Sequence, residues 1–354
     1  MTKPLEIVQI CRRFGPVGGM ERYVWELCRE LAAMGHQVHV LCEANRCTEV
    51  VKGVHIHELG IVRPRPRWLA HIRFSRHVHT WLKQHRTANM IIHSHERSQD
   101  HHITTFHGPP FAQVKERPLW KRFSLRIKMN LWLEEREIYQ PQVQMIVPNS
   151  MHIRQQLKKY YPTISKKITK PIVPGVGDII QRSPRNIPLQ GGVIGFIGKE
   201  WKRKGLPMAI DAISELSKIR PDLHFLVAGC DKKEIEHLFK HSSFQYTLLG
   251  RVEPNSFYQK LDILLHPAQS EPFGMVITEA MTARVPVVIS ENCGATSEVT
   301  EQYGSILPLT AKNKTWANEL HQWLNKEGIH VQYEYSWYDV AMSYKQLYQQ
   351  VSLL

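Results

Sequence analysis

The stretch Glu271-Pro-Phe-Gly-Met-Val-Ile-Thr-Glu279 places two carboxylates at the mouth of an expected helix, directly after the apolar run 261–266. Such a short apolar run is typical of a buried parallel strand, and the apolar residues from Val276 onward recur at helical spacing. A second apolar run, 286–289, follows the helix. This strand, loop, helix and strand predict a parallel α/β sheet, in which ligands bind at the carboxyl ends of the strands.

The chemistry of the same stretch suits a nucleotide-sugar site. A glycine at the strand-to-helix turn, Gly274, leaves backbone N–H groups for an anion. The carboxylates of Glu271 and Glu279 can accept hydrogen bonds from sugar hydroxyls. Two acids eight residues apart also occur by chance, so Glu271 as an ordinary loop acid and Glu279 as a solvated helix residue remain the alternative.

The string Ser270-Glu-Pro-Phe-Gly274 with Glu279 resembles the Glu-x7-Glu signature of the retaining GT-B glycosyltransferases of the family 4 type. The resemblance implies an α/β fold of two doubly wound, Rossmann-like domains facing across a cleft, with a C-terminal helix that crosses back to the first domain. It also implies that Glu271 contacts the donor sugar and that Glu279 holds the ribose. The amides of Gly274 and Met275 would bind the pyrophosphate.

The same family needs no metal, and the sequence contains no Asp-x-Asp motif that would suggest one. We therefore expect no cofactor and no metal site, only a nucleotide sugar as co-substrate. The six cysteines show no CxxC spacing, and several lie in apolar segments, which favours buried reduced thiols over disulfides or a zinc site.

A basic cluster follows the apolar run 192–198, and the helix expected from Pro207 comes next. Cations between a strand end and a helix can neutralise a diphosphate as its charge grows in the transition state. By resemblance Lys204 matches a diphosphate-binding lysine of the family, and Lys199 stands where an arginine is usual. Arg251 falls in the region that frames the nucleotide base. A solvated charge run is the alternative for the cluster.

The N-terminal half opens with a strand at 6–11, a Gly/Pro loop and a helix expected at 20–34. Gly18 and Gly19 can simply make a tight turn; the resemblance implies that they contact the donor phosphate or line the acceptor cleft. His107 follows an expected strand at 103–106. A lone histidine is more often structural, but the family carries one in a similar place beside the donor sugar.

The charge is concentrated in the first half of the chain. Residues 1–177 hold 28 Lys and Arg against 13 Asp and Glu, a net charge of +15, whereas residues 178–354 hold 18 against 19, a net charge of −1. A basic half beside a near-neutral half suggests that one domain faces a polyanion. Membrane lipid, anionic glycolipid and nucleic acid all fit this charge.

Residues 111–139 interleave basic and aromatic residues, which predicts an amphipathic helix suited to an anionic membrane surface. We expect Trp120, Lys121, Arg122 and Arg126 to contact the membrane or the acceptor. The alternative is a helix that packs on the core and exposes a basic face. No nucleic-acid-binding motif is found, so we expect no nucleic-acid partner.

A length of 354 residues suits two domains. We expect an acceptor-binding, membrane-facing domain at 1–178, a nucleotide-sugar-binding domain at 190–330, and a segment at 331–354 that packs back on the first domain. No apolar run is long enough to span a membrane, and no signal-peptide pattern is seen. The expected location is therefore cytoplasmic, peripheral on the inner face of the cytoplasmic membrane.

Among subfamilies, the runs 198–205, 18–22 and 264–268 look most like lipopolysaccharide core glucosyltransferase I. This resemblance implies transfer of a hexose, glucose from UDP-glucose, to a heptose of a lipid-linked core. Three other classes stay open on the sequence: a nucleotide-sugar epimerase of the same fold, a membrane-associated sugar-binding protein without catalysis, and a nucleic-acid binder.

Overall fold

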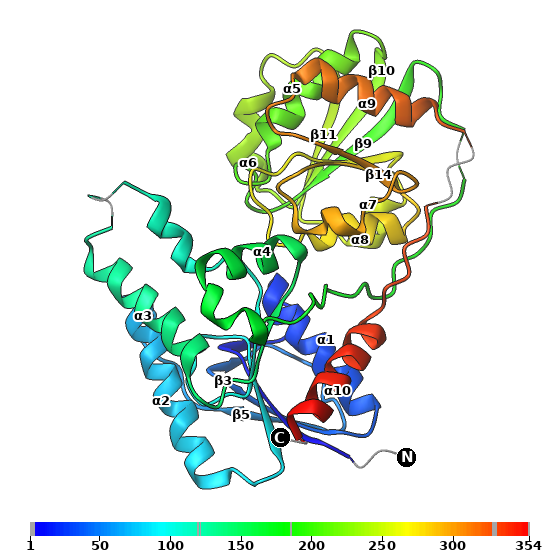
Figure 1. The fold of residues 1–354 in the computed structure, drawn as a ribbon. Helices are drawn as coiled ribbons and strands as arrows, with labels where there is room; N and C mark the ends of the chain where they lie inside the picture. The colour runs from blue at the N-terminus through cyan, green and yellow to red at the C-terminus, as the bar shows by residue number, and fades with distance from the viewer. Residues whose placement is uncertain (1–3, 119, 121, 185, 328–330, 353–354) are drawn as a thin grey trace. The chain divides into compact units, whose positions relative to one another are not determined.

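The computed structural model describes residues 4–118, 120, 122–184, 186–327 and 331–352. The chain forms two compact units: one runs up to Gly175 and resumes at Ser336, and the other spans Val176–Tyr335. We call them the N-domain and the C-domain. Each contains a six-stranded sheet in which every strand pair is parallel (Figure 1). The predicted α/β architecture of two Rossmann-like sheets is confirmed.

The N-domain sheet has the order β5-β3-β1-β6-β7-β8. Its central strands read as short apolar runs because both faces of a parallel sheet are covered. A separate two-residue pair, β2 with β4, lies beside the helix α1. The strands are β1 (Glu6–Ile10), β2 (Arg13–Phe14), β3 (Gln37–Cys42), β4 (Ala44–Asn45), β5 (Val54–Glu58), β6 (Met90–Ser94), β7 (Ile103–Phe106) and β8 (Met145–Pro148).

The helices of the N-domain connect these strands. The α-helices are α1 (Gly19–Ala33), α2 (Arg67–His85), α3 (Leu125–Tyr139), α4 (Met151–Tyr160) and α10 (Trp337–Ser352), and the 3-10 helices are η1 (Phe111–Glu116) and η3 (Pro162–Lys167).

The C-terminal helix α10 belongs to the N-domain, as predicted, and packs against α1 (Figure 1). Its inner face buries Val340, Tyr344 and Tyr348 completely. The chain leaves and re-enters the domain at one point, because a Cβ on Gly175 would lie 2.6 Å from the backbone of Ser336. Only glycine allows the two segments to approach so closely.

The C-domain sheet has the order β11-β10-β9-β12-β13-β14, and the helices α5 and α9 pack together over one face of it (Figure 1). Phe196, Phe225 and Trp316 are fully buried in the core between them. The strands are β9 (Gly191–Ile197), β10 (Asp222–Ala228), β11 (Gln245–Gly250), β12 (Ile263–His266), β13 (Val287–Ser290) and β14 (Gly304–Leu307). The helices are α5 (Leu206–Ser217), α6 (Lys232–Ile235), η4 (Glu236–Phe239), α7 (Pro254–Tyr258), α8 (Met275–Thr282), η5 (Gly294–Glu298) and α9 (Asn313–Asn325).

The prediction of a single amphipathic helix over 111–139 is wrong. The segment forms the 3-10 helix η1 and then the separate helix α3. Pro118 lacks the N–H that a continuing helix needs, and the residue before it, Arg117, is extended at φ −71° and ψ 154°. Ser124 starts α3 by accepting a hydrogen bond from the amide of Ile127 at 3.3 Å.

Among the described residues, no helix has the length and apolar character needed to cross a bilayer. The six cysteines carry no disulfide, and only Cys47 is not buried. Within the same described residues, no group of three or more histidine, cysteine or acidic side chains is placed to hold a metal ion.

Replacing Gly205 with alanine should lower the free energy of unfolding of the C-domain by about 3 kcal/mol. Gly205 has a φ of +81°, and a Cβ there would lie 1.9 Å from the carbonyl oxygen of Pro267. Gly250 is the matched control, because its φ is +72° but its nearest neighbour would be the flexible end of Lys232 at 3.4 Å. Gly250→Ala should therefore cost about 1 kcal/mol. Denaturant-dependent hydrogen exchange of the C-domain amides measures both, and equal losses would contradict the steric argument.

Candidate active site

Glu271 lies in the loop after β12, at the carboxyl edge of the C-domain sheet. Its amide donates to the carbonyl of Asn292 at 3.0 Å, and its own carbonyl accepts from the amide of Gly294 at 2.8 Å. Gly294 permits this contact, because a Cβ there would lie 1.9 Å from the carbonyl oxygen of Pro272. The backbone on both sides of the carboxylate is therefore fixed.

Three basic side chains converge on the carboxylate of Glu271. Its Oε2 lies 3.3 Å from Lys204 Nζ, 3.5 Å from Arg203 Nη1 and 3.5 Å from His266 Nε2. Burial alone would raise the pKa of Glu271. The contact with His266 and the charges of Lys204 and Arg203 outweigh it and lower the pKa to about 2. Glu271 is therefore ionised although it is only 8% exposed.

Lys204 reaches Glu271 because Gly198, at the end of β9, has no side chain. A Cβ on Gly198 would lie 2.1 Å from Lys204 Cδ, so any other residue would displace the lysine. Lys199 differs from Lys204: it is exposed and is not among the basic groups that the structure brings to Glu271. Of the two lysines predicted from sequence, only Lys204 joins the cluster.

Arg203 and His266 join this cluster but were not among the predicted site residues. Arg203 also donates to the carbonyl of Ser270 and to the carboxylate of Glu200, which hold its guanidinium beside Glu271. His266 is the last residue of β12 and is fully buried, and burial lowers its pKa. The sequence signal for His266 was its position at a strand end. A histidine that ends an apolar run is more readily interpreted as a core residue, so this signal was not used.

Gly274 and the start of α8 form the neighbouring part of the site. Gly274 has a φ of +99° and is the N-cap of α8, so the Met275 amide lies in the first turn, where helix N–H groups lack helical acceptors. Glu279 lies on α8 and is 5% exposed, and its Oε2 accepts from Tyr258 Oη at 2.8 Å. It is therefore not the solvated residue of the alternative interpretation. Arg251 is exposed at the end of β11.

The two predicted glycines of the N-domain differ in their surroundings. Gly18 is the N-cap of α1, and a Cβ there would lie 2.4 Å from Glu21 Oε2. The carboxylate of Glu21 is paired with Arg13. Nothing lies within 4 Å of a Cβ built on Gly19. A side chain at position 18 would therefore displace the carboxylate of Glu21, whereas position 19 has space for one.

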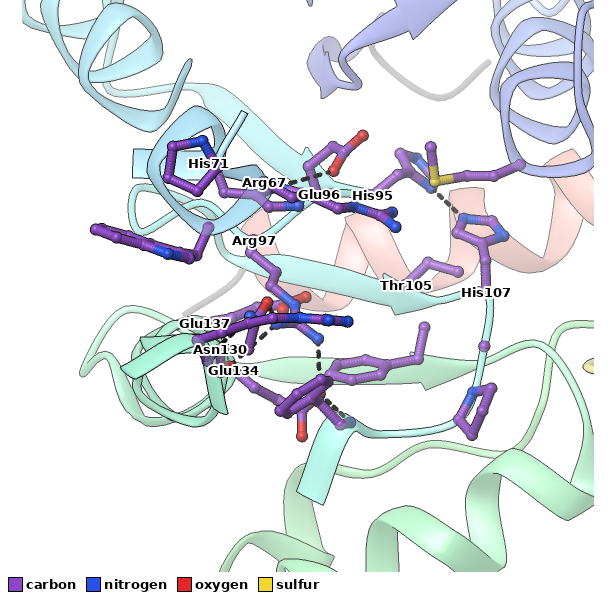
Figure 2. A pocket seen from close by; sticks show the side chains of 18 of the residues that line it. Arg67, His71, His95, Glu96, Arg97, Thr105, His107, Asn130, Glu134 and Glu137 are labelled. Atoms are coloured by element: carbon purple, nitrogen blue, oxygen red, sulfur yellow. Dashed lines mark hydrogen bonds and ion pairs between the residues drawn. The ribbon is translucent and has the colours of Figure 1, made fainter. Parts of the chain in front are cut away.

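The N-domain contains a cavity of about 720 Å³ at the carboxyl ends of β6 and β7 (Figure 2). We call it the N-domain cavity. Helices α2 and α3 and the loops after β6 and β7 supply most of its wall. Arginines are prominent in the lining, as expected for a site that takes an anionic group. The polar and charged lining residues are Arg65, Arg67, His71, His95, Glu96, Arg97, Thr105, His107, Arg126, Asn130, Glu134 and Glu137.

His107 follows β7 and lines the N-domain cavity. Its Nε2 lies 2.8 Å from His95 Nδ1, and the ring of Tyr23 meets it edge-on at a centroid distance of 4.8 Å (Figure 2 shows the two histidines). Burial lowers the pKa of His107 to about 3. At neutral pH its imidazole is therefore uncharged and acts through hydrogen bonds.

Buried acids on α3 shape the opposite wall of the cavity. Glu134 accepts hydrogen bonds from the amides of Phe111 and Ala112 and from Tyr161 Oη, so it anchors η1 directly after the His107 loop. It also pairs with Arg97 at 3.3 Å, which directs that guanidinium along the cavity wall (Figure 2). Glu134 is therefore a structural acid, and the inner face of α3 is not purely apolar.

Two further carboxyl groups in the cavity wall have raised pKa values. Burial raises the pKa of Glu96 to about 7 and that of Glu137 to about 8. Near neutral pH both groups are protonated in part, so each can donate a hydrogen bond as well as accept one. A cavity with arginines and such carboxyl groups can bind a ligand that carries both phosphates and hydroxyls.

The residues expected to contact a membrane are only partly described. Trp120 is 77% exposed and Phe123 is 72% exposed, which leaves two large apolar side chains in solvent. Arg122 donates to the carbonyl of Arg117, and Arg126 is exposed and also lines the N-domain cavity. Lys121 lies outside the described residues.

Both halves of the chain match known families. Residues 178–337 match Glycosyl transferases group 1, and residues 17–176 match Glycosyltransferase Family 4. The two matches meet at the boundary between the N-domain and the C-domain.

Two curated relatives match parts of the chain at about 30% identity. An uncharacterized glycosyltransferase of Methanocaldococcus jannaschii, MJ1178, is 30% identical over 172 residues, which cover 44% of this chain and 48% of the relative. The lipopolysaccharide glucosyltransferase WaaG of Escherichia coli K12 is 31% identical over 121 residues, 32% of each chain. The chain thus spans about half the length of the first relative and a third of the second.

Solved structures match nearly the whole chain. The crystal structure of WaaG, a glycosyltransferase involved in lipopolysaccharide biosynthesis, has a TM-score of 0.77 at 17% identity and covers 98% of both chains. HepE of Anabaena, solved in complex with UDP-glucose, has a TM-score of 0.68 at 14% identity and also covers 98% of both chains. At these identities the likeness establishes the GT-B fold.

The Glu271 cluster should make the C-domain sensitive to acid. The folded pKa of about 2 lies below the ordinary value of 4.5, so the stabilisation is complete above pH 4.5 and is lost as the pH falls toward 2. From pH 5 to pH 3, protonation of Glu271 should lower the free energy of unfolding of the wild-type C-domain by about 2 kcal/mol. Glu271→Gln should not show this decrease. Denaturant-dependent hydrogen exchange at both pH values measures it. Glu236→Gln, at an exposed carboxylate outside the cluster, is the control; a wild-type slope in Glu271→Gln would refute the assignment.

Proposed function

The chain belongs to the GT-B glycosyltransferases, with a family 4 domain followed by a group 1 domain, and we propose that it transfers a hexose from a nucleotide diphosphate sugar to a lipid-linked acceptor. The observation that carries the proposal is the cluster of Lys204, Arg203 and His266 around the ionised Glu271. It lies where parallel α/β sheets bind ligands, next to the N-terminus of α8.

The donor diphosphate is assigned to the C-domain. Lys204 and the first amides of α8, at Gly274 and Met275, would stabilise the negative charge that grows on the departing nucleoside diphosphate. Lys204 is suited to this because Glu271 already holds its ammonium in place at 3.3 Å. Preorganised charge does not have to be arranged during the reaction, and this is where most electrostatic rate enhancement arises. Lys199 remains a secondary contact in the proposal.

The remaining donor contacts follow the family resemblance. Glu279 would accept from the ribose, with Tyr258 keeping its carboxylate in place at 2.8 Å. Glu271 and the neutral His107 would position the hexose, Arg251 would frame the base, and the loop at Gly18 would border the donor phosphate. We propose UDP-glucose as the donor, which the UDP-glucose complex of HepE and the name of WaaG support.

The acceptor is assigned to the N-domain cavity. Arg65, Arg67 and Arg126 are exposed cations in its lining. Their charge suits an acceptor that carries phosphates, and the partly protonated Glu96 and Glu137 suit sugar hydroxyls. We propose a heptose of the lipopolysaccharide inner core as the accepting sugar, joined with retention of anomeric configuration and without a metal.

Product mass tests the proposal most directly. The chain would be incubated with a panel of nucleotide sugars and with extracted lipid core. Transfer predicts that the lipid mass rises by one hexose with a single donor, UDP-glucose. Donor turnover without acceptor would indicate an epimerase instead, and donor binding without any product would indicate a sugar-binding protein.

Lys204→Met is expected to lower kcat of transfer by a factor of about 100 to 1,000, because the leaving diphosphate loses a preorganised cation. Lys202→Met is the matched control: this lysine lies two residues away, is exposed, and has its Nζ 5.0 Å from the ring centre of Trp201. It should keep wild-type kcat. Initial rates with saturating acceptor measure both variants. A small effect at Lys204 would remove this lysine from the diphosphate site.

We also propose that the segment from Trp120 to Arg126 rests on an anionic membrane surface. Exposed Trp120 and Phe123 supply apolar contacts, and Arg122 and Arg126 supply positive charge beside them. This combination is typical of peripheral proteins at lipid headgroups. It would keep the chain at the inner face of the cytoplasmic membrane, where a lipid-linked acceptor is available.

Charge reversal tests the membrane proposal. Each basic residue near an anionic surface contributes about 1 kcal/mol, so Arg122→Glu with Arg126→Glu should weaken binding to anionic vesicles by about 30-fold or more. The control is Lys312→Glu with Lys314→Glu, two exposed lysines of the C-domain. Co-sedimentation with vesicles of anionic and of neutral lipid gives the affinities, and equal weakening by the two double variants would argue against a local membrane site.

A further inference from the structure

A continuous run of hydrogen bonds links His107 in the cavity wall to the C-terminal helix α10. It passes through the side chains of three central strands, and each step is a short contact. In order, the contacts are His107 Nε2 to His95 Nδ1 at 2.8 Å, His95 Nε2 to Gln9 Oε1 at 2.8 Å, Gln9 Nε2 to Tyr348 Oη at 2.9 Å, Tyr348 Oη to His93 Nδ1 at 2.8 Å, His93 Nε2 to Thr105 Oγ1 at 2.8 Å, Thr105 Oγ1 to Tyr344 Oη at 2.7 Å, Tyr344 Oη to Tyr23 Oη at 3.0 Å, and Tyr23 Oη to the Ile172 carbonyl at 3.3 Å.

The members of this run are uncharged. Gln9, His93 and both tyrosines of α10 are fully buried, and His95 is 5% exposed. Burial lowers the pKa of His93 and of His95 well below the usual value. A neutral imidazole has one nitrogen that donates and one that accepts. Each histidine in the run must therefore donate on one side and accept on the other.

The amide of Gln9 sets the direction of the run. Its nitrogen donates to Tyr348 Oη at 2.9 Å, so its oxygen, which faces His95 Nε2 at 2.8 Å, can only accept. At the far end Tyr23 Oη is the donor, to Tyr344 Oη at 3.0 Å and to the Ile172 carbonyl at 3.3 Å.

The orientation of this amide fixes the near end, because Tyr348 Oη is the acceptor that its nitrogen requires. The amide oxygen of Gln9 then accepts from Nε2–H of His95, and His95 Nδ1 accepts from Nε2–H of His107. His107 Nδ1 is left without a proton. One neutral His107 tautomer satisfies every contact of the run.

We propose that Tyr348 of α10, acting through Gln9 and His95, holds His107 in its Nε2–H tautomer, so that its Nδ1 accepts a hydrogen bond from a ligand hydroxyl. The ligand chemistry follows from this: a sugar hydroxyl can donate to Nδ1, whereas an ionised phosphate oxygen cannot. Tyr348 is a positioning residue that acts through other side chains. The assignment of the ligand rests on the proposed function, but the tautomer does not.

The tautomer can be read without any enzymatic assay. Two-bond proton–nitrogen correlation spectra of the full chain labelled with ¹⁵N-histidine distinguish Nε2–H from Nδ1–H, and the His107→Gln spectrum identifies the His107 signals. The wild type should show the Nε2–H form alone. Tyr348→Phe removes the acceptor of the Gln9 amide nitrogen. The amide group can then rotate by 180° and present either its oxygen or its nitrogen to His95, so His107 should populate both tautomers.

Two further variants complete the test. Tyr338→Phe, at an exposed tyrosine of the same helix, should leave the wild-type tautomer unchanged. Gln9→Glu should also retain it, because a carboxyl oxygen still accepts from His95. An Nδ1–H form in the wild type, or a single Nε2–H form in Tyr348→Phe, would overturn the proposal.

Kinetics separate this proposal from the proposed function. If transfer occurs, Tyr348→Phe should lower kcat at least about twofold, in proportion to the fraction in the wrong tautomer, with little change in KM for the donor. Gln9→Glu, which retains the tautomer, should keep a kcat close to that of the wild type. If the wild type showed the Nε2–H tautomer but no transfer, the proposed function would be rejected and the positioning role would stand. If Tyr348→Phe showed both tautomers but an unchanged kcat, the proposed transfer would stand and His107 would have no part in it.

Discussion

Parallel strand pairing is the constraint on which both candidate sites depend. Every pair in the two six-stranded sheets is parallel, so each strand is followed by a crossover and all the loops after strands emerge at one edge. In the C-domain this brings the loop after β9, with Lys204, to the loop after β12, with Glu271. In the N-domain it brings His95, after β6, to His107, after β7. Residues far apart in the sequence meet because the sheet leaves them no other edge.

Three buried carboxyl groups of the two candidate sites have pKa shifts of opposite sign. Glu271 keeps its charge because Lys204 and Arg203 compensate for burial, and its pKa falls to about 2. Glu96 and Glu137 lack sufficient compensation, and burial raises their pKa to about 7 and about 8. The first arrangement holds cations in place for an anion. The second offers hydrogen-bond donors and acceptors, which suits polar groups without charge.

The sequence predicted what is local and periodic. The strand at 103–106 appears with those bounds, and the spacing of Glu271, Gly274 and Glu279 placed them at a strand-to-helix turn. The prediction of one helix over 111–139 was wrong because it rested on the number of basic and aromatic residues and did not consider the break at Pro118. The role of His266, and the run that joins Gln9 to α10, could not be read from the sequence. Gln9 and Tyr348 are 339 residues apart, and no local pattern records such a contact.

The return of α10 to the N-domain has a consequence for synthesis on the ribosome. The C-domain is one uninterrupted segment, Val176–Tyr335, and can fold as soon as it has emerged. The N-domain begins to be translated first but lacks the helix that buries Tyr344 and Tyr348 against it until α10, Trp337–Ser352, has been made. N-terminal domains usually fold first during synthesis. Here the N-domain can be completed only after the C-domain has emerged. Until then the surface that α10 covers stays available to chaperones.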